Sequence, residues 1–234
     1  MDYFSLFFLH YFIGHGFCDF IPLLYTFDKN VLLNYIFFIF INCYIHILSQ
    51  SFSTLVFVLL SSIHLSGDFH PFNTIKFPGI GLFLLGMPLI GDYSLYYEIL
   101  EFIGVYNINL FLILMLIGGI LSIMNNLYEN RYSFLVVYIL LSYFLGIKTL
   151  IFYMIYFHTT ISICILCEKY DMDKIFAFLL FGTLSSITTY IFLYNEVEFL
   201  IFNYKDYVIG SLYGLLNSHS LTTIFWRYNE KCLR

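Results

Sequence analysis

The chain has 234 residues, of which 61% are hydrophobic and only 11% are charged, and its net charge is -5. A soluble domain carries roughly 25% charged residues, so the composition indicates an integral membrane protein rather than a soluble domain. No basic patch is present that would bind nucleic acid, and no hydrophilic block is long enough to fold alone, so 1–234 is predicted to form a single integral membrane domain.

Apolar runs, broken by turn residues and charges, predict an all-α fold in the form of a polytopic bundle of about eight or nine transmembrane helices. The expected spans, in chain order, are 4–26, 31–48, 51–66, 78–91, 108–124, 133–146, 148–167, 174–194 and 206–226. The stretch 92–105 is ambiguous, and an interfacial helix is one interpretation. The most charged break is the loop 168–174.

The basic residues predict the orientation of this bundle. Nine helices would divide the loops between the two sides of the membrane. Of the 10 lysines and arginines, only Lys148 and Lys205 fall on one side, and the others fall on the opposite side. Because cytoplasmic loops carry the excess of Lys and Arg, the chain is predicted to be a multi-pass membrane protein. Its N-terminus is expected outside and its C-terminus in the cytoplasm.

Four histidines lie within the predicted spans. Ionisable residues inside a membrane span are costly and are functional candidates. His15, His64, His158 and His219 lie on four helices that run in the same direction, each at the middle or in the cytoplasmic half of its span. They are therefore expected to converge at a similar depth, where neutral imidazoles would suit iron, copper, zinc or nickel.

Two of these histidines are followed by an aspartate. His15 and Asp19, like His64 and Asp68, are four residues apart, which places both side chains on one face of a helix. A carboxylate that accepts the outer N–H of a metal-bound imidazole fixes its tautomer. Asp19 and Asp68 are therefore predicted to support the metal ligands rather than to bind the metal.

The alternative for each single histidine is a hydrogen bond to a neighbouring helix, without any ligand. That interpretation is preferred for three other residues. His10 lies on a different face from His15, His46 lies at a helix end, and His70 lies in a loop before Pro71. These three histidines are expected to be interfacial or structural.

Short motifs follow one another along nearly the whole chain. They are Gly-His-Gly-Phe-Cys-Asp at 14–19, Ser-Ser-Ile-His-Leu-Ser-Gly-Asp at 61–68, a segment with glycine and proline at 78–89 followed by 96–100, Tyr-Phe-His at 156–158, and Leu-Asn-Ser-His at 216–219. In this order they resemble the motifs of the Brp/Blh-type β-carotene 15,15'-dioxygenases, membrane enzymes that make retinal. The first is similar to that family's Pro-His-Gly-x-x-Asp, and the second to its Ser-x-x-His-Phe-Gly-x-x-Asp.

The resemblance implies O2-dependent cleavage of the central double bond of β-carotene to two retinals at a non-haem Fe(II). The four histidines would be the catalytic metal ligands. Tyr156 and Phe157, beside His158, would be walls of a substrate tunnel. β-Carotene is apolar and would enter from the lipid bilayer, and a retinal-binding rhodopsin is a candidate acceptor of the product.

This sequence departs from the family at three positions. The second histidine of the family's third motif falls at Ser162, and the proline before histidine is replaced by Gly14 in the first motif and by Ser218 in the last. The change at Ser162 removes a candidate iron ligand. Either His219 completes the set, or the site differs from that of the family.

Two other functions remain open at this point. One is an intramembrane metal-dependent hydrolase, with zinc on the same histidines and Asp19 or Asp68 as general base. The other is a small transporter whose His–Asp pairs relay protons or bind a cation, although the sequence contains no convincing internal repeat of the kind common in transporters.

Overall fold

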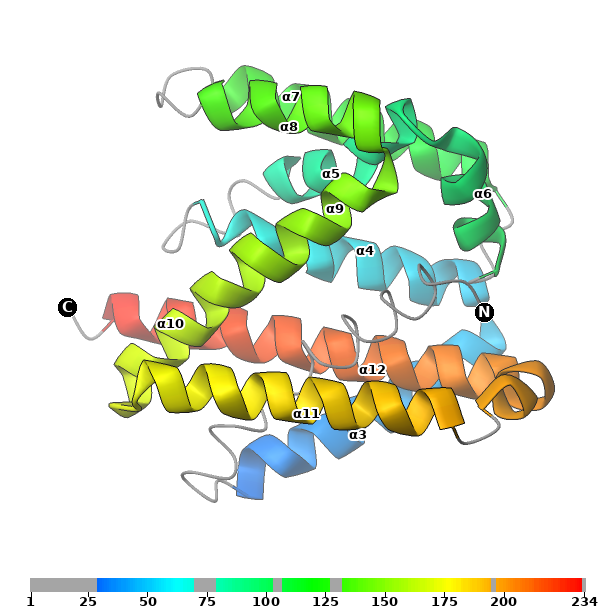
Figure 1. The fold of residues 1–234 in the computed structure, drawn as a ribbon. Helices are drawn as coiled ribbons and strands as arrows, with labels where there is room; N and C mark the ends of the chain where they lie inside the picture. The colour runs from blue at the N-terminus through cyan, green and yellow to red at the C-terminus, as the bar shows by residue number, and fades with distance from the viewer. Residues whose placement is uncertain (1–28, 70–78, 103–106, 127–131, 195–196, 233–234) are drawn as a thin grey trace. The chain divides into compact units, whose positions relative to one another are not determined.

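The computed structural model describes residues 29–69, 79–102, 107–126, 132–194 and 197–232, and the regular elements within them are helices (Figure 1). In chain order these are α3 (Lys29–Leu48), α4 (Gln50–Ser66), α5 (Gly79–Gly86), the 3₁₀ helix η3 (Met87–Ile90), α6 (Tyr93–Phe102), α7 (Ile108–Asn126), α8 (Tyr132–Leu145), α9 (Ile147–Phe152), the π-helical turn η4 (Tyr153–His158), α10 (Thr159–Tyr170), α11 (Lys174–Tyr194) and α12 (Val197–Cys232).

The helix positions predicted from the apolar runs are confirmed within these residues. The runs 31–48 and 51–66 correspond to α3 and α4, and 174–194 coincides with α11. The ambiguous stretch 92–105 contains α6, whereas the first predicted span, 4–26, lies outside the described residues.

The predicted membrane crossings are wrong. Across the described part of the chain, no helix combines the length and the apolar character that a crossing needs. A crossing takes about 20 consecutive apolar residues, but α4 has 17 residues and α8 has 14. The long α12 is interrupted at Tyr204, where the backbone leaves helical geometry beside Lys205 and Asp206. This finding overturns both the transmembrane bundle and the multi-pass localisation with its orientation.

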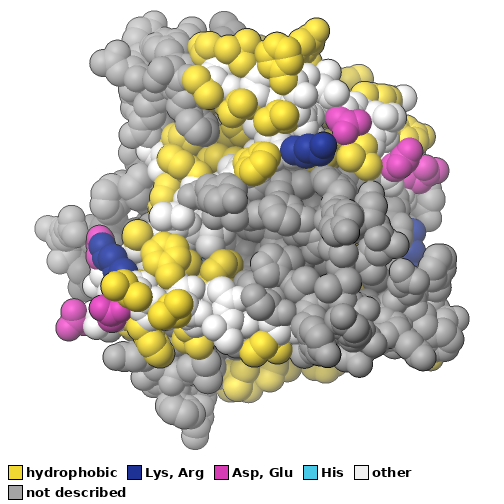
Figure 2. All heavy atoms as spheres, in the orientation of Figure 1, with side chains coloured by type: hydrophobic (Ala, Val, Ile, Leu, Met, Phe, Trp, Pro, Cys, Tyr) yellow, Lys and Arg dark blue, Asp and Glu magenta, His cyan; other side chains and the backbone are white. Residues whose placement is uncertain are grey.

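Large apolar side chains remain exposed on several of the described helices. On α8, Val136, Leu140, Tyr143 and Phe144 are all more than half exposed, and Phe144 reaches 75%. Figure 2 shows hydrophobic side chains over much of the described surface, including the region of α7 and α8. Apolar patches of this kind mark surfaces that contact other molecules.

The contacts group the chain into two compact units. One comprises 1–48 and 154–219, whose described helices are α3, α10, α11 and the larger part of α12. The other comprises 49–153 and 220–234, with α4 to α9 and the last residues of α12. Each unit has its own buried residues and its own polar contacts.

In the unit that contains α4, close packing of α4 on α5 sets the position of the helix ends. The Ser66 hydroxyl accepts a hydrogen bond from the backbone N–H of Gly81 at 2.9 Å and donates to the Ser62 carbonyl at 2.8 Å. A Cβ at residue 81 would overlap the Ser62 carbonyl oxygen, so this approach requires glycine. The Tyr138 hydroxyl adds a bond from α8 to the Leu84 carbonyl of α5, at 2.7 Å.

In the other unit, α3 and α12 share a buried polar contact. The Asn217 amide donates to the side-chain oxygen of Asn42 at 2.7 Å, and the Asn42 amide donates to the Phe38 carbonyl at 2.8 Å. Gly214 allows the two backbones to approach, because a Cβ there would overlap Ile39. Buried amides of this kind stabilise a helix pair only when they are hydrogen-bonded.

His46 lies in this same interface and is fully buried. Its ring packs edge-on against Tyr213, with the ring centroids 5.5 Å apart. Neither ring nitrogen has a hydrogen-bond partner among the described residues. Burial lowers the pKa of His46; Asp206 acts to raise it and Lys205 to lower it further. The neutral imidazole is therefore favoured, and of the two roles expected for His46, interfacial or structural, its buried position fits the structural one.

Replacing Gly81 by alanine tests the contact of α4 with α5. We expect Gly81→Ala to reduce the free energy of unfolding by about 1–3 kcal/mol, the usual effect of overpacking a tight contact. Gly182→Ala in α11 is the matched control, since a Cβ there meets nothing within 4 Å, and it should be neutral or stabilising by about 0.4–1 kcal/mol. Chemical denaturation measures both, and equal losses in the two variants would contradict the proposed packing.

Acidification should destabilise the protein through His46. A histidine whose pKa is lowered in the folded state takes up its proton more readily when unfolded, so stability is lost as the pH falls below the ordinary pKa of 6.5. We expect part of this loss to disappear in His46→Gln, which cannot be protonated. Unfolding free energies measured between about pH 5 and pH 8 test this, and identical pH dependence in the variant and the native chain would rule it out.

Candidate metal centre

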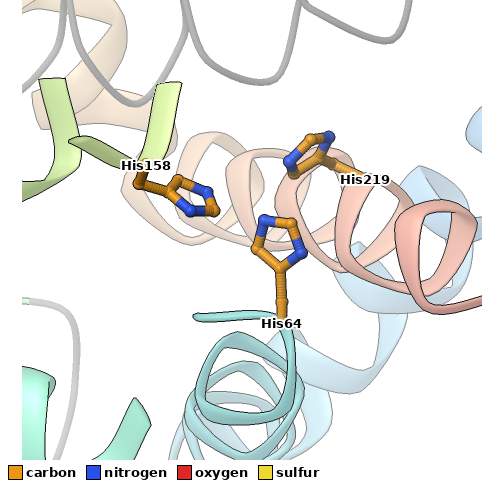
Figure 3. A group of neighbouring side chains, drawn as sticks. All are labelled: His64, His158 and His219. Carbon is orange, nitrogen blue, oxygen red and sulfur yellow. The ribbon is translucent and has the colours of Figure 1, made fainter. Parts of the chain in front are cut away.

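Three of the four predicted ligands come together. His64, His158 and His219 each offer one ring nitrogen, and these three atoms all lie within 4.8 Å of one another. Figure 3 shows the rings pointing toward a common space from three separate helical segments. The side chains are buried, with exposed fractions of 4% for His64, 0% for His158 and 2% for His219. The cluster could hold a metal ion.

His64 is carried by the last turn of α4. The helix begins at a Ser49 cap, whose hydroxyl accepts from the Phe52 N–H, and it ends where the Gly67 N–H bonds back to the His64 and Leu65 carbonyls. The Ser66–Gly81 hydrogen bond lies two residues beyond His64 and attaches this end of α4 to α5. The position of the imidazole therefore depends on the close packing of these two helices.

His158 is the last residue of a π-helical turn. The segments α9, η4 and α10 form one continuous helical run from Ile147 to Tyr170, and η4 occupies its centre. The Thr159 hydroxyl donates to the Met154 carbonyl, five residues earlier, at 2.9 Å. π-Turns are rare in proteins and occur frequently at functional sites. Here the turn sets the direction in which His158 leaves the helix.

His219 lies on α12 within a buried polar stretch. Asn217, Ser218 and Ser220 are at most 3% exposed. The Ser218 hydroxyl is bonded to the Gly214 carbonyl at 2.7 Å, and Asn217 is bonded to Asn42 of α3. Of these polar neighbours of His219, Asn217 attaches α12 to α3, and Ser218 is bonded within α12 itself.

The donor set fits a transition-metal ion. Imidazole nitrogens that share one ion lie roughly 3–4 Å apart, since each metal–nitrogen bond is about 2.0–2.1 Å. The three ring nitrogens here all lie within 4.8 Å of one another, a range that includes this spacing. Burying three imidazoles together is costly unless their nitrogens find polar partners. Neutral imidazole binds iron, copper, zinc and nickel well, so these residues alone do not select iron.

Asp68 lies just beyond α4 and has a partner that the sequence did not suggest. Its Oδ2 accepts a hydrogen bond from the Tyr153 hydroxyl at 2.7 Å. The adjacent Phe69 stacks on the Tyr153 ring, with centroids 6.4 Å apart and an interplanar angle of 9°. That Asp68 supports His64 stays a prediction. His15 and Asp19 lie outside the described residues.

The remaining predicted site residues surround His158 in the chain. Phe157 is 40% exposed, so it lies at a surface rather than wholly in a buried wall. The side chain of Tyr156 is outside the described part of the structure. Ser162, one helical turn beyond His158, is 4% exposed, and its hydroxyl has no hydrogen-bond partner within the described residues. The position where the resemblance places a histidine is therefore a buried polar one.

Comparison with known proteins finds no family model, no curated protein and no solved structure that matches the chain. The likeness to the carotene dioxygenases consequently depends on the short motifs, and the metal centre depends on the geometry of its three histidines.

Metal binding should depend on each histidine of the cluster. We expect His64→Ala, His158→Ala and His219→Ala each to lower metal affinity by more than about 100-fold, because changes outside the ligand set alone cost about 10- to 100-fold. His46→Ala is the control, since His46 is equally buried but is not part of the cluster. Equilibrium dialysis followed by elemental analysis measures the effect. Full binding by any of the three cluster variants would remove that residue from the ligand set.

Proposed function

We propose that this chain is a non-haem iron enzyme that cleaves β-carotene with O2 at the central 15,15' double bond to give two retinals. The observation that carries the proposal is the buried cluster of His64, His158 and His219. The sequence predicts all three residues as ligands. Each belongs to a short motif that resembles a motif of the carotene dioxygenases.

The protein would supply the metal ligands, and the metal would supply the chemistry. Fe(II) on neutral imidazoles with an open coordination position binds O2. His64, His158 and His219 would hold the ion, and three protein ligands would leave room on it for O2 and substrate, as catalytic metal sites require. Burial of the ligands keeps bulk water from competing there.

The reaction is balanced without a reductant. The C15=C15' bond breaks, and each of its carbons gains one oxygen atom, so both atoms of O2 end in the two aldehydes. A site for this reaction needs an O2-binding metal and an apolar surface that orients a long polyene, but no second cofactor. A cluster of three imidazoles, which can hold a metal ion, agrees with the need for an O2-binding metal.

The surroundings of His158 favour an apolar substrate. Phe157 precedes it and is 40% exposed, which offers an aromatic contact near a buried ligand. Aromatic side chains present large apolar areas in fixed orientations, which suits the alignment of a rigid polyene.

Retinal formation in cells tests the proposal. The full chain is expressed in cells that make β-carotene, and retinal is measured by chromatography. We expect retinal from the native chain, at least about 100-fold less from His64→Ala, which loses a ligand, and native levels from His46→Ala. The metal content of the purified protein is measured in parallel.

Iron with retinal would support the dioxygenase. Zinc without retinal would contradict it and favour the metal-dependent hydrolase, because three histidines with an open position also form catalytic zinc sites. Native retinal levels from His64→Ala would show that the reaction does not use this centre.

A further inference from the structure

We infer that Tyr153 and Asp68 form a positioning pair that fixes the directions of His64 and His158 for metal binding. The inference rests on the proposed metal centre but concerns residues outside its ligand set. Nothing in the sequence motifs associates Tyr153 with the site, and its partner is 85 positions away in the chain.

Two contacts join Tyr153 to the end of α4. Its hydroxyl donates to Asp68 Oδ2 at 2.7 Å, and its ring stacks on Phe69. Tyr153 is 5% exposed and Phe69 is 9% exposed, so the stacked rings are buried, while the hydrogen bond to the half-buried Asp68 is partly buried. A hydrogen bond to a carboxylate is stronger than one between neutral groups, which makes this pair a firm attachment.

The attachment lies close to both ligands along the chain. Asp68 follows His64 by four residues, across the tight turn in which the Asp68 N–H bonds the Leu65 carbonyl at 3.2 Å. Tyr153 opens the π turn that ends at His158. One hydrogen bond therefore links the turn after the first ligand to the start of the turn that carries the second.

A second tyrosine contact holds the Tyr153 ring from another side. Tyr138 packs edge-on against it, with centroids 6.0 Å apart and an interplanar angle of 87°. The Tyr138 hydroxyl bonds the Leu84 carbonyl, also at 2.7 Å, and Tyr138 is 2% exposed. Tyr138 thus resembles Tyr153 in burial and in hydrogen-bond length, but its hydrogen bond joins α8 to α5 and touches neither ligand-bearing turn.

The test uses Co(II) as a spectroscopic probe on the purified full chain. Its visible absorption bands report the arrangement of the ligands, which a general loss of stability does not alter in protein that remains folded. We expect Tyr153→Phe, which keeps the ring and loses the hydroxyl, to shift these bands and to weaken Co(II) binding about 10-fold, as removal of a group that orients a ligand does. Asp68→Ala should have the same effect.

Three further variants separate positioning from stability. The double variant Tyr153→Phe/Asp68→Ala should lose no more affinity than either single variant, because one interaction is removed in all three. Asp68→Asn keeps an acceptor oxygen and should lie closer to the native chain. Tyr138→Phe should lower the thermal unfolding midpoint while leaving the Co(II) spectrum unchanged.

The outcomes are distinct. A native chain that binds no Co(II) would overturn the metal centre itself. Binding by the native chain, together with an unchanged spectrum and an affinity within about twofold in Tyr153→Phe, would overturn the positioning role alone. If Tyr153→Phe does not fold, Asp68→Ala reports on the same hydrogen bond, and the native spectrum in that variant would likewise contradict the inference.

Discussion

The burial of polar groups inside a mostly apolar chain is the constraint on which the rest of this structure depends. An imidazole, amide or hydroxyl removed from water must find a partner or it opposes folding. The Asn217 amide N–H meets this requirement by donating to the Asn42 side-chain oxygen, and the Asn42 amide N–H donates to the Phe38 carbonyl. The cluster of His64, His158 and His219 could meet it by holding a metal ion, which would turn three buried imidazoles into a binding site. His46 is an exception to this rule: its ring packs against Tyr213, neither ring nitrogen has a hydrogen-bond partner among the described residues, and burial lowers its pKa. Four buried histidines thus divide into a candidate site and a structural group.

Close helix contact is the second condition for the site. Ser66 can reach the Gly81 backbone only because no side chain stands between α4 and α5. On α12, Gly214 has the same role toward α3. These contacts are made by backbone atoms and small polar side chains, which have few alternative rotamers. Ligands carried by such helices lose little conformational freedom on binding a metal, and preorganisation of this kind favours both affinity and a defined geometry.

The sequence was sufficient for local structure and for the choice of three histidines that the fold brings together, and insufficient for contacts between distant segments. Polar breaks such as Glu168–Asp173 gave helix ends within a few residues, because charges and turn formers end helices locally. His64, His158 and His219 were recognisable because polar residues within long apolar runs are unusual. The membrane crossings were inferred from the overall composition and from apolar runs, several of which are shorter than the roughly 20 residues that a crossing takes. They were wrong because no described helix combines the length and the apolar character that a crossing needs. The Asp68–Tyr153 bond and the π turn at His158 depend on tertiary packing, for which no periodicity in the sequence gives a signal.

The π turn also affects how the helical run 147–170 responds to changes in chain length. Successive residues of an α-helix are rotated by about 100° around its axis. A π turn closes its hydrogen bonds over five residues instead of four, so it holds one residue more than an α-helical turn. Side chains of α10 are therefore rotated, relative to those of α9, from where an uninterrupted helix would place them. Loss of one residue within 153–158 would restore a plain α-helix and turn α10 about its own axis. The chain would remain helical throughout, yet α10 would present a different face to α11. The number of residues in 153–158 therefore determines which face of α10 is turned toward α11.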